Sequence, residues 1–204
     1  MSRADKFRKA LQAKIDNLNA AKNKVVKVGI VEHQKYDDNT PVAYIASIHE
    51  YGARFTVPER KATIYRKVTS NGEWTSKHGS EFVKKEASNF ATEVTIPAHM
   101  VNIPARPFMR PTISEKKGEW AKIGKQFLKN GGSVEGMLNL IGGQAARNIE
   151  ETISKIETPP LKKSTIKARN GSYKSKSSES STKPLVDTKM LKSSISHIVT
   201  DKGD

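Results

Sequence analysis

Apolar residues that recur every three or four positions predict four helices along this chain. The first covers residues 5–21, and the second covers about 41–51. The second is apolar around most of its circumference, so we expect it to be buried on two sides. The third begins after residue 112, and the fourth, the longest, covers about 133–157. The apolar face of the first helix carries Phe7, Leu11, Ile15 and Leu18.

Short polar motifs predict where these helices begin and end. Asn39-Thr40-Pro41 offers a cap and a first-turn proline for the second helix, and Gly52 stands where a glycine cap ends a helix. Thr112 and Glu115 have the spacing of a capping box before the third helix. Thr158-Pro159-Pro160 ends the fourth helix.

Runs rich in β-branched residues predict the strands. The strand candidates are residues 24–31, 62–68, 82–83, 91–96, 100–103 and 198–200. Residues 70–73 are typical of a turn, and the polar tract 69–80 favours a projecting loop or hairpin over core.

Together these elements predict an α+β fold, in which a small antiparallel sheet packs against several helices. We expect extended arms and a projecting hairpin or loop as well. Residues 1–157 form the predicted core, with residues 55–103 inserted as the loop or hairpin region. Residues 158–204 form a basic, flexible C-terminal arm with a short helix around Leu191 and a terminal strand, and its stretch 170–183 is rich in Ser and Lys.

The segment 103–112, Ile-Pro-Ala-Arg-Pro-Phe-Met-Arg-Pro-Thr, is the most distinctive part of the chain. Its three prolines predict a stiff, extended conformation that is neither helix nor central strand. Its two arginines have no acidic residue near them in the sequence. Two interpretations stay open: an arm that docks on a neighbouring subunit, and a rigid connector within one domain.

The charge balance points to an anionic partner. The chain has 36 basic and 21 acidic residues, a formal net charge of +15, which suits nucleic acid, an acidic protein surface or an acidic ring. Cysteine is absent, which excludes disulfides and thiolate metal sites. The N-terminus has no signal-peptide pattern and no apolar run is long enough to span a bilayer, so we expect a soluble protein with no membrane partner.

No motif indicates catalysis. The five histidines form no metal-binding pair, and His49-Glu50 lacks the second histidine of a zinc helix. Gly142-Gly143 has no phosphate-loop context and is better explained by close helix packing. We expect no enzymatic activity, no catalytic residue, no cofactor and no metal.

The C-terminal arm holds the candidates for contacts with phosphate or with an acidic partner. They are Lys162, Lys163, Lys167, Arg169, Lys174 and Lys176. Such a set can bind phosphates without reading sequence. The alternative is a solvated tail that becomes ordered on a partner protein.

Four segments in this order resemble the neck and tail-completion proteins of tailed bacteriophages, a family of minor tail and virion-morphogenesis components. They are residues 41–54, 103–112, 159–166 and 183–195. Two departures stand out: Lys189 replaces the glycine of the family's Asp-Thr-Gly motif, and the long 55–100 region is found in only some relatives.

The resemblance implies a structural subunit of the virion, assembled in the host cytoplasm, which joins the DNA-filled head to the tail. It implies a ring of six or twelve copies that contacts neck, tail-terminator or tail proteins and touches channel DNA without sequence preference. The candidate subunit-interface residues are Pro104, Arg106, Pro107, Phe108, Met109 and Arg110. We expect Phe108→Ala with Arg110→Ala to spare the fold and block head–tail joining. The alternative function is a sequence-nonspecific DNA-binding protein for packaging or DNA organisation.

Overall fold

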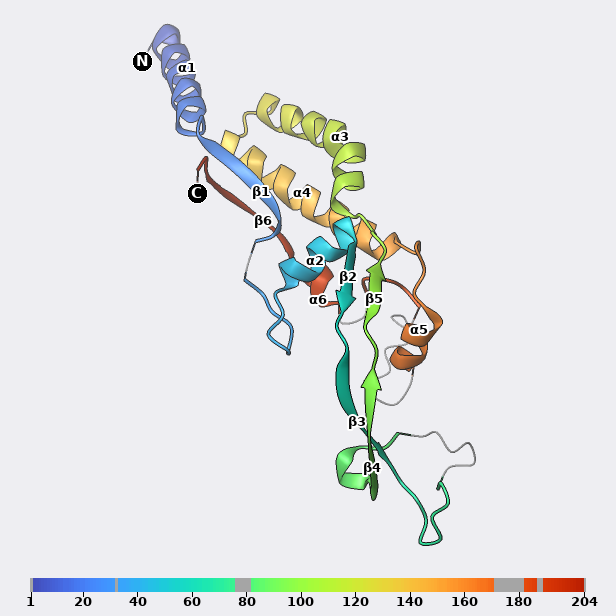
Figure 1. The fold of residues 1–204 in the computed structure, drawn as a ribbon. Coiled ribbons are helices and arrows are strands. Elements are labelled where there is room, and N and C mark those ends of the chain that lie inside the picture. Colours follow the sequence, from blue (N-terminus) through green and yellow to red (C-terminus); the bar gives the residue numbers. More distant parts are fainter. Residues whose placement is uncertain (1, 32, 76–81, 171–181, 187–188, 204) are drawn as a thin grey trace. The chain divides into compact units, whose positions relative to one another are not determined.

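The computed structural model describes residues 2–31, 33–75, 82–170, 182–186 and 189–203. They form a mixed α+β fold, which confirms the predicted fold class (Figure 1). The chain divides into two compact units, one made of Met1–Gly52 with Pro104–Asp204 and the other of Ala53–Ile103.

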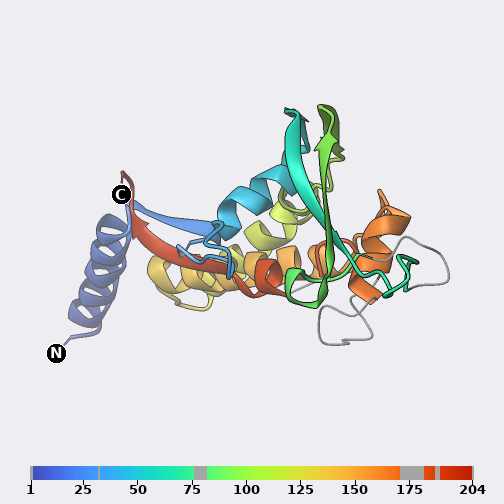
Figure 2. The same cartoon turned by 60° about the horizontal axis from the view of Figure 1, so that its bottom comes forward.

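Helix α4 (Val134–Lys155) is the centre of the first unit. It packs against α3 (Met109–Lys129) and against the pair of strands β1 (Lys24–Ile30) and β6 (Ile195–Asp201), as Figures 1 and 2 show. The two strands are antiparallel, from Lys24↔Asp201 to Ile30↔Ile195. Pairing of the first and last described strands therefore joins the two ends of this unit.

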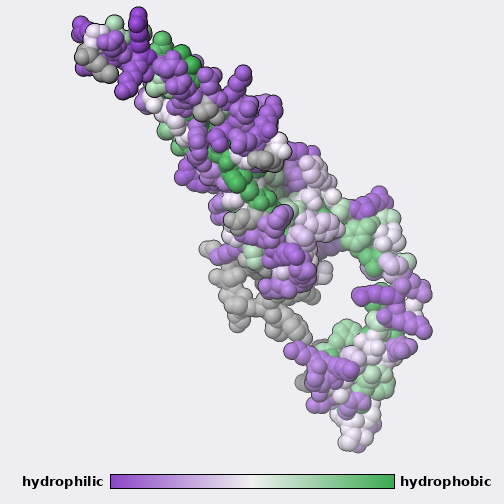
Figure 3. Space-filling view, turned by 90° about the vertical axis from the view of Figure 1, so that its left-hand side faces the viewer, coloured by the Kyte–Doolittle hydropathy of each residue, from purple (hydrophilic) through white to green (hydrophobic). Residues whose placement is uncertain are grey.

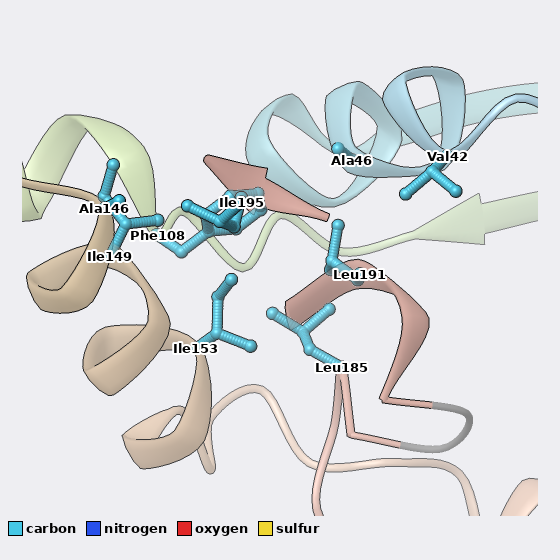
Figure 4. Packing of buried hydrophobic residues seen from close by; sticks show 9 residues of the cluster. All are labelled: Val42, Ala46, Phe108, Ala146, Ile149, Ile153, Leu185, Leu191 and Ile195. Carbon is cyan, nitrogen blue, oxygen red and sulfur yellow. The ribbon is translucent and has the colours of Figure 1, made fainter. Parts of the chain in front are cut away.

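The hydrophobic core lies where α4, α2 (Val42–Tyr51) and the C-terminal segment meet (Figure 4). Leu185, Leu191 and Ile195 belong to this core, although the sequence places them in a flexible arm. They are apolar positions scattered through polar sequence, and only partners far away in the chain bury them. The core residues are Val42, Ala46, Phe108, Ala146, Ile149, Ile153, Leu185, Leu191 and Ile195.

The helix ends show which capping signals were correct. Ser133 caps α4 by accepting a hydrogen bond from the Gly136 N–H, and Gly52, with φ of 77°, follows α2 as predicted. The start of α2 differs from the prediction, because the capping residue is Pro41 and no side chain caps the helix. Helix α1 (Arg3–Ala20) begins with a capping box between Ser2 and Asp5.

The second unit is a two-stranded ribbon. Strand β2 (Ala53–Val57) pairs with β5 (His99–Ile103), and β3 (Arg60–Arg66) pairs with β4 (Phe90–Ile96). Both pairs are antiparallel and share one register, since Val57 faces His99 and Arg60 faces Ile96 with two residues between on each strand. Those residues include Pro58 and Pro97, which have no N–H to donate and so interrupt the ladder.

The far end of the ribbon is held by aromatic rings. The Arg66 guanidinium lies 5.1 Å from the Trp74 ring centroid and 5.6 Å from that of Phe82, and Trp74 meets Phe90 edge to face. Phe82 and Val83 lie outside any strand, contrary to the prediction, and the short helix η1 (Lys85–Ala87) follows them. Strand β2 was not predicted, because its partner β5 is far away in the sequence.

The C-terminal region contains two further helices, α5 (Lys163–Asn170) and α6 (Met190–Ser193). The sequence predicts α6 but not α5. Lys189 precedes α6 with φ of 58°, the left-handed region that glycine favours. Lys189 therefore adopts a conformation that is more typical of glycine. Most of the Ser/Lys-rich stretch 170–183 lies outside the described residues.

The adjacent glycines of α4 provide a test of its packing on β1 and β6. A Cβ at Gly142 would lie 2.5 Å from His197 and 2.7 Å from Val26, whereas a Cβ at Gly143 would be 3.6 Å from its nearest neighbour. We expect Gly142→Ala to lower the free energy of unfolding by about 1–3 kcal/mol through overpacking. Gly143→Ala should be neutral or stabilising by up to about 1 kcal/mol, from helix propensity. Urea denaturation measures both, and equal effects would contradict the close packing at Gly142.

Candidate functional site: the anchored proline-rich segment

The proline-rich segment passes into a helix before it ends. Helix α3 starts at Met109, so Pro111 is its third residue, and the prediction that 103–112 contains no helix is wrong. Proline is tolerated in a first turn because the N–H it lacks has no partner within the helix there.

A single carboxylate caps this helix from another element. Glu50, in the last turn of α2, accepts hydrogen bonds from the backbone N–H groups of Phe108 (2.7 Å), Met109 (2.9 Å) and Arg110 (3.0 Å). Pro111 follows and has no N–H, so the donors at the start of α3 are satisfied. The negative charge of Glu50 also lies at the positive end of the α3 dipole.

Arg110 adds a charged contact to the same carboxylate. Its Nε lies 3.0 Å from Glu50 Oε1, its Nη2 donates to the Glu50 carbonyl oxygen at 2.7 Å, and its guanidinium lies 4.7 Å from the Tyr51 ring centroid. Glu50 is only 4% exposed, whereas the Arg110 side chain is 58% exposed. The backbone donors therefore hold the buried acid, and Arg110 completes the contact from the surface.

The electrostatics of Glu50 follow from these contacts. Burial alone raises the pKa of a carboxyl group, but the hydrogen bonds from Met109, Arg110 and Phe108 outweigh it and bring the pKa of Glu50 below its usual value. Glu50 is thus ionised at neutral pH.

Arg106 fastens the segment at a second point. Its backbone N–H donates to the His49 carbonyl oxygen at 2.7 Å, and its guanidinium donates to the carbonyl oxygens of Pro159 (2.8 Å) and Pro160 (3.2 Å). It joins the end of α2 to the segment that follows α4. Burial, and then the positive charge of Arg169, lowers the pKa of Arg106.

Thr112 does not cap α3, and the predicted capping box is wrong. The Thr112 hydroxyl donates to the Phe108 carbonyl oxygen and lies 2.6 Å from the hydroxyl of Thr152 on α4. Thr112 is already inside the helix, because the long-range cap from Glu50 starts the helix earlier than a local motif would.

The candidate interface residues fall into three groups by burial. Phe108 and Arg106 are buried, Pro107 and Met109 are half-buried, and Pro104 and Arg110 are exposed. The contacts of Arg106, Phe108 and Arg110 described above lie within the chain, which favours the connector interpretation. The expectation that Phe108→Ala spares the fold is wrong, because this ring is fully buried in the core.

The basic candidates that the structure describes lie in α5 or directly before it. Lys162 and Lys163 are exposed at the start of α5, and Lys167 lies on the same helix. Arg169 lines a cavity, and its Nη1 donates to the Lys183 carbonyl oxygen. Lys174 and Lys176 lie outside the described residues.

Glu50 is the residue that sequence reasoning missed. In the sequence, Glu50 stands out only as part of an incomplete zinc motif. It is, however, the one acidic side chain in the apolar stretch 42–51. Two arginines without a nearby acid, and a single acid in an otherwise apolar helix, could have suggested the pair.

Within the described ranges, no group of three acidic or histidine side chains could hold a metal ion, and no helix is long and apolar enough to cross a membrane. Comparison with protein-family models, curated proteins and solved structures finds no match to the chain.

Removing the Glu50 carboxylate should weaken the joint between α2 and α3. We expect Glu50→Ala to lower the free energy of unfolding by about 3–5 kcal/mol, because three buried donors lose their acceptor. Glu50→Gln keeps one acceptor oxygen and should cost about 1–2 kcal/mol. The matched control is Glu151→Gln, whose carboxylate is exposed and lies 3.9 Å from Lys155, and it should change stability by less than about 0.5 kcal/mol. Chemical denaturation measures all three.

Acidification should destabilise the folded chain because His49 is half-buried. Burial, helped by Arg106 and Arg169, lowers the pKa of His49 to about 4, whereas a histidine in the unfolded chain has its usual pKa of 6.5. The unfolded chain therefore binds more protons between pH 6.5 and 4, and stability should fall across that window. Glu50 should add a further loss as pH falls below its unfolded value of 4.5.

Thermal unfolding at a series of pH values tests this expectation. His49→Gln should flatten the dependence between pH 6.5 and 4.5, and His33→Gln, at an exposed position, should leave it unchanged. An unaltered slope in His49→Gln would show that other groups carry the pH dependence.

Proposed function

We propose that this chain is a structural, non-enzymatic subunit of a bacteriophage neck or tail-completion ring, which joins the DNA-filled head to the tail. The observation that carries the proposal is the exposed apolar side of α1. Its four large side chains are 41–69% exposed: Phe7, Leu11, Ile15 and Leu18.

These four side chains form a stripe, which we call the α1 stripe. Their spacing of four, four and three residues places them on one side of the helix. Hydrophobic surface is visible along this helix among hydrophilic residues in Figure 3. Burying each side chain against a partner would contribute roughly 1–3 kcal/mol, which is enough to drive association.

The ribbon of the second unit supports assembly for a different reason. An isolated two-stranded sheet is marginally stable in water, and both of its edges keep unpaired N–H and C=O groups. Each described strand pairs with a single neighbour. Phe55 and Met100 on the ribbon are also exposed, which suits a partner on its surface.

The anchored proline-rich segment suits a subunit that must keep its shape within an assembly. Glu50 and Arg106 fix the entry to α3 from two directions, so the helix cannot easily change its angle to α2. The order of the four segments that resemble neck and tail-completion proteins supports this identity for the ring.

Self-association tests the assembly. We expect the purified chain to form rings of six or twelve copies in native mass spectrometry, and Leu11→Ser with Ile15→Ser to shift the population to monomers, because the α1 stripe loses its central side chains. The matched control is Leu140→Ser, an exposed apolar side chain on α4 that should leave the distribution unchanged.

Particle imaging tests the location, with the protein expected at the head–tail junction in electron micrographs of virions. A chain that stays monomeric at all concentrations and is absent from particles would overturn the proposal. If it also bound duplex DNA with a steep salt dependence, the alternative of a sequence-nonspecific DNA-binding protein would replace it.

A further inference from the structure

The first unit contains a cavity of about 420 Å³ that no part of the proposed function uses. It lies beside α2 and α5, next to Arg106 and the C-terminal core. We infer that this cavity binds a single carboxylate group. Its lining includes Ile45, His49, Arg106, Leu161, Arg169 and Leu191.

The argument begins with the charge of Arg106. This side chain is 5% exposed, yet within the described residues its guanidinium meets two neutral carbonyl oxygens and no carboxylate within ion-pair distance. Buried charges are normally paired, because desolvation is costly without an opposite charge. The buried Glu50 carboxylate, by contrast, is paired with the exposed Arg110 and accepts from three backbone N–H donors. Among the residues that the structure describes, the buried acid is neutralised, whereas the buried base meets only carbonyl oxygens.

A second cation and an unused nitrogen lie on the same cavity. Arg169 lines it and is close enough to Arg106 for the two like charges to disfavour each other. His49 also lines it, and its Nδ1 is buried without a hydrogen-bond partner. An anion here would relieve the repulsion between the arginines and could accept a hydrogen bond from the imidazole.

The rest of the lining selects the kind of anion. Isoleucine and leucine side chains form apolar walls, and the exposed Asp37 and Asp38 also line the cavity. Their negative charges disfavour a polyanion such as a DNA backbone. A guanidinium binds carboxylates and phosphates alike, but a nucleic-acid backbone would bring a row of negative charges past the two aspartates, whereas a carboxylate brings one. The favoured ligand is therefore an acidic side chain or a chain terminus on an otherwise uncharged or basic segment.

Titration with acetate tests the inference on the intact chain. Acetate replaces chloride at constant ionic strength, and the Nε–H signals of ¹⁵N-labelled arginines are followed by NMR. We expect the Arg106 signal to shift with saturation in the millimolar range. Arg169→Gln should raise the acetate Kd at least fivefold, and Asp37→Asn should lower it about twofold.

The matched control is Arg147→Gln, which removes the same charge from the exposed face of α4 and should leave the acetate Kd unchanged. Arg169→Lys, which keeps the charge, should bind acetate more weakly than wild type but more tightly than Arg169→Gln. Near-ultraviolet circular dichroism verifies that each variant is folded. The carboxylate site would be overturned if the Arg106 signal shifted linearly with acetate, or shifted equally with chloride. Tighter binding of inorganic phosphate, or an acetate Kd that Arg169→Gln leaves unchanged, would also overturn it.

The source of the carboxylate is a separate question, and a second copy of the chain as the source rests on the proposed function. A shift of the Arg106 signal with protein concentration, lost in Arg169→Gln, identifies a second copy. Acetate binding without such a shift keeps the site and assigns its ligand to another molecule. Failure of self-association alone would leave the acetate result intact.

Discussion

The capping of α3 by Glu50 is the contact on which the first unit depends. Without it, the start of α3 would present three donors to a region that also holds the buried Phe108 ring. The carboxylate fixes the start of α3 against the end of α2. Helix α3 packs on α4, which in turn packs on β1 and β6. A single side chain thus links the local conformation of a proline-rich segment to the tertiary arrangement around α4.

The sequence predicted those elements whose signals are local. The apolar spacing of α4, the cap at Ser133 and the glycine after α2 lie within a few residues of the structures they determine, and all three are confirmed. The same holds for β1, in which β-branched residues occupy four of seven positions. Where apolar periodicity, the capping residue and the helix-ending residue agree within one short stretch, the chain has few alternative local structures.

The failures come from contacts between distant residues. The start of α3 depends on an acid about sixty positions earlier in the sequence. The local capping motif therefore predicts a start at Thr112 instead. Leu185 and Leu191 looked like isolated apolar residues in a polar tail, and the core that buries them is built largely from other parts of the chain. The sequence places no acid next to the two arginines of the proline-rich segment, and only the fold pairs Arg110 with Glu50. In the described part of the chain, the Arg106 guanidinium meets carbonyl oxygens instead.

The unbroken register of the ribbon has a consequence for how such proteins can vary. Because residues on a strand alternate between faces, a single insertion on one strand would exchange the inner and outer sides of everything beyond it. Changes in length are compatible with the pairing only when both strands gain or lose the same number of residues, and the faces are kept only in steps of two. During evolution the ribbon can therefore change its length in steps of roughly 7 Å without any change in the first unit.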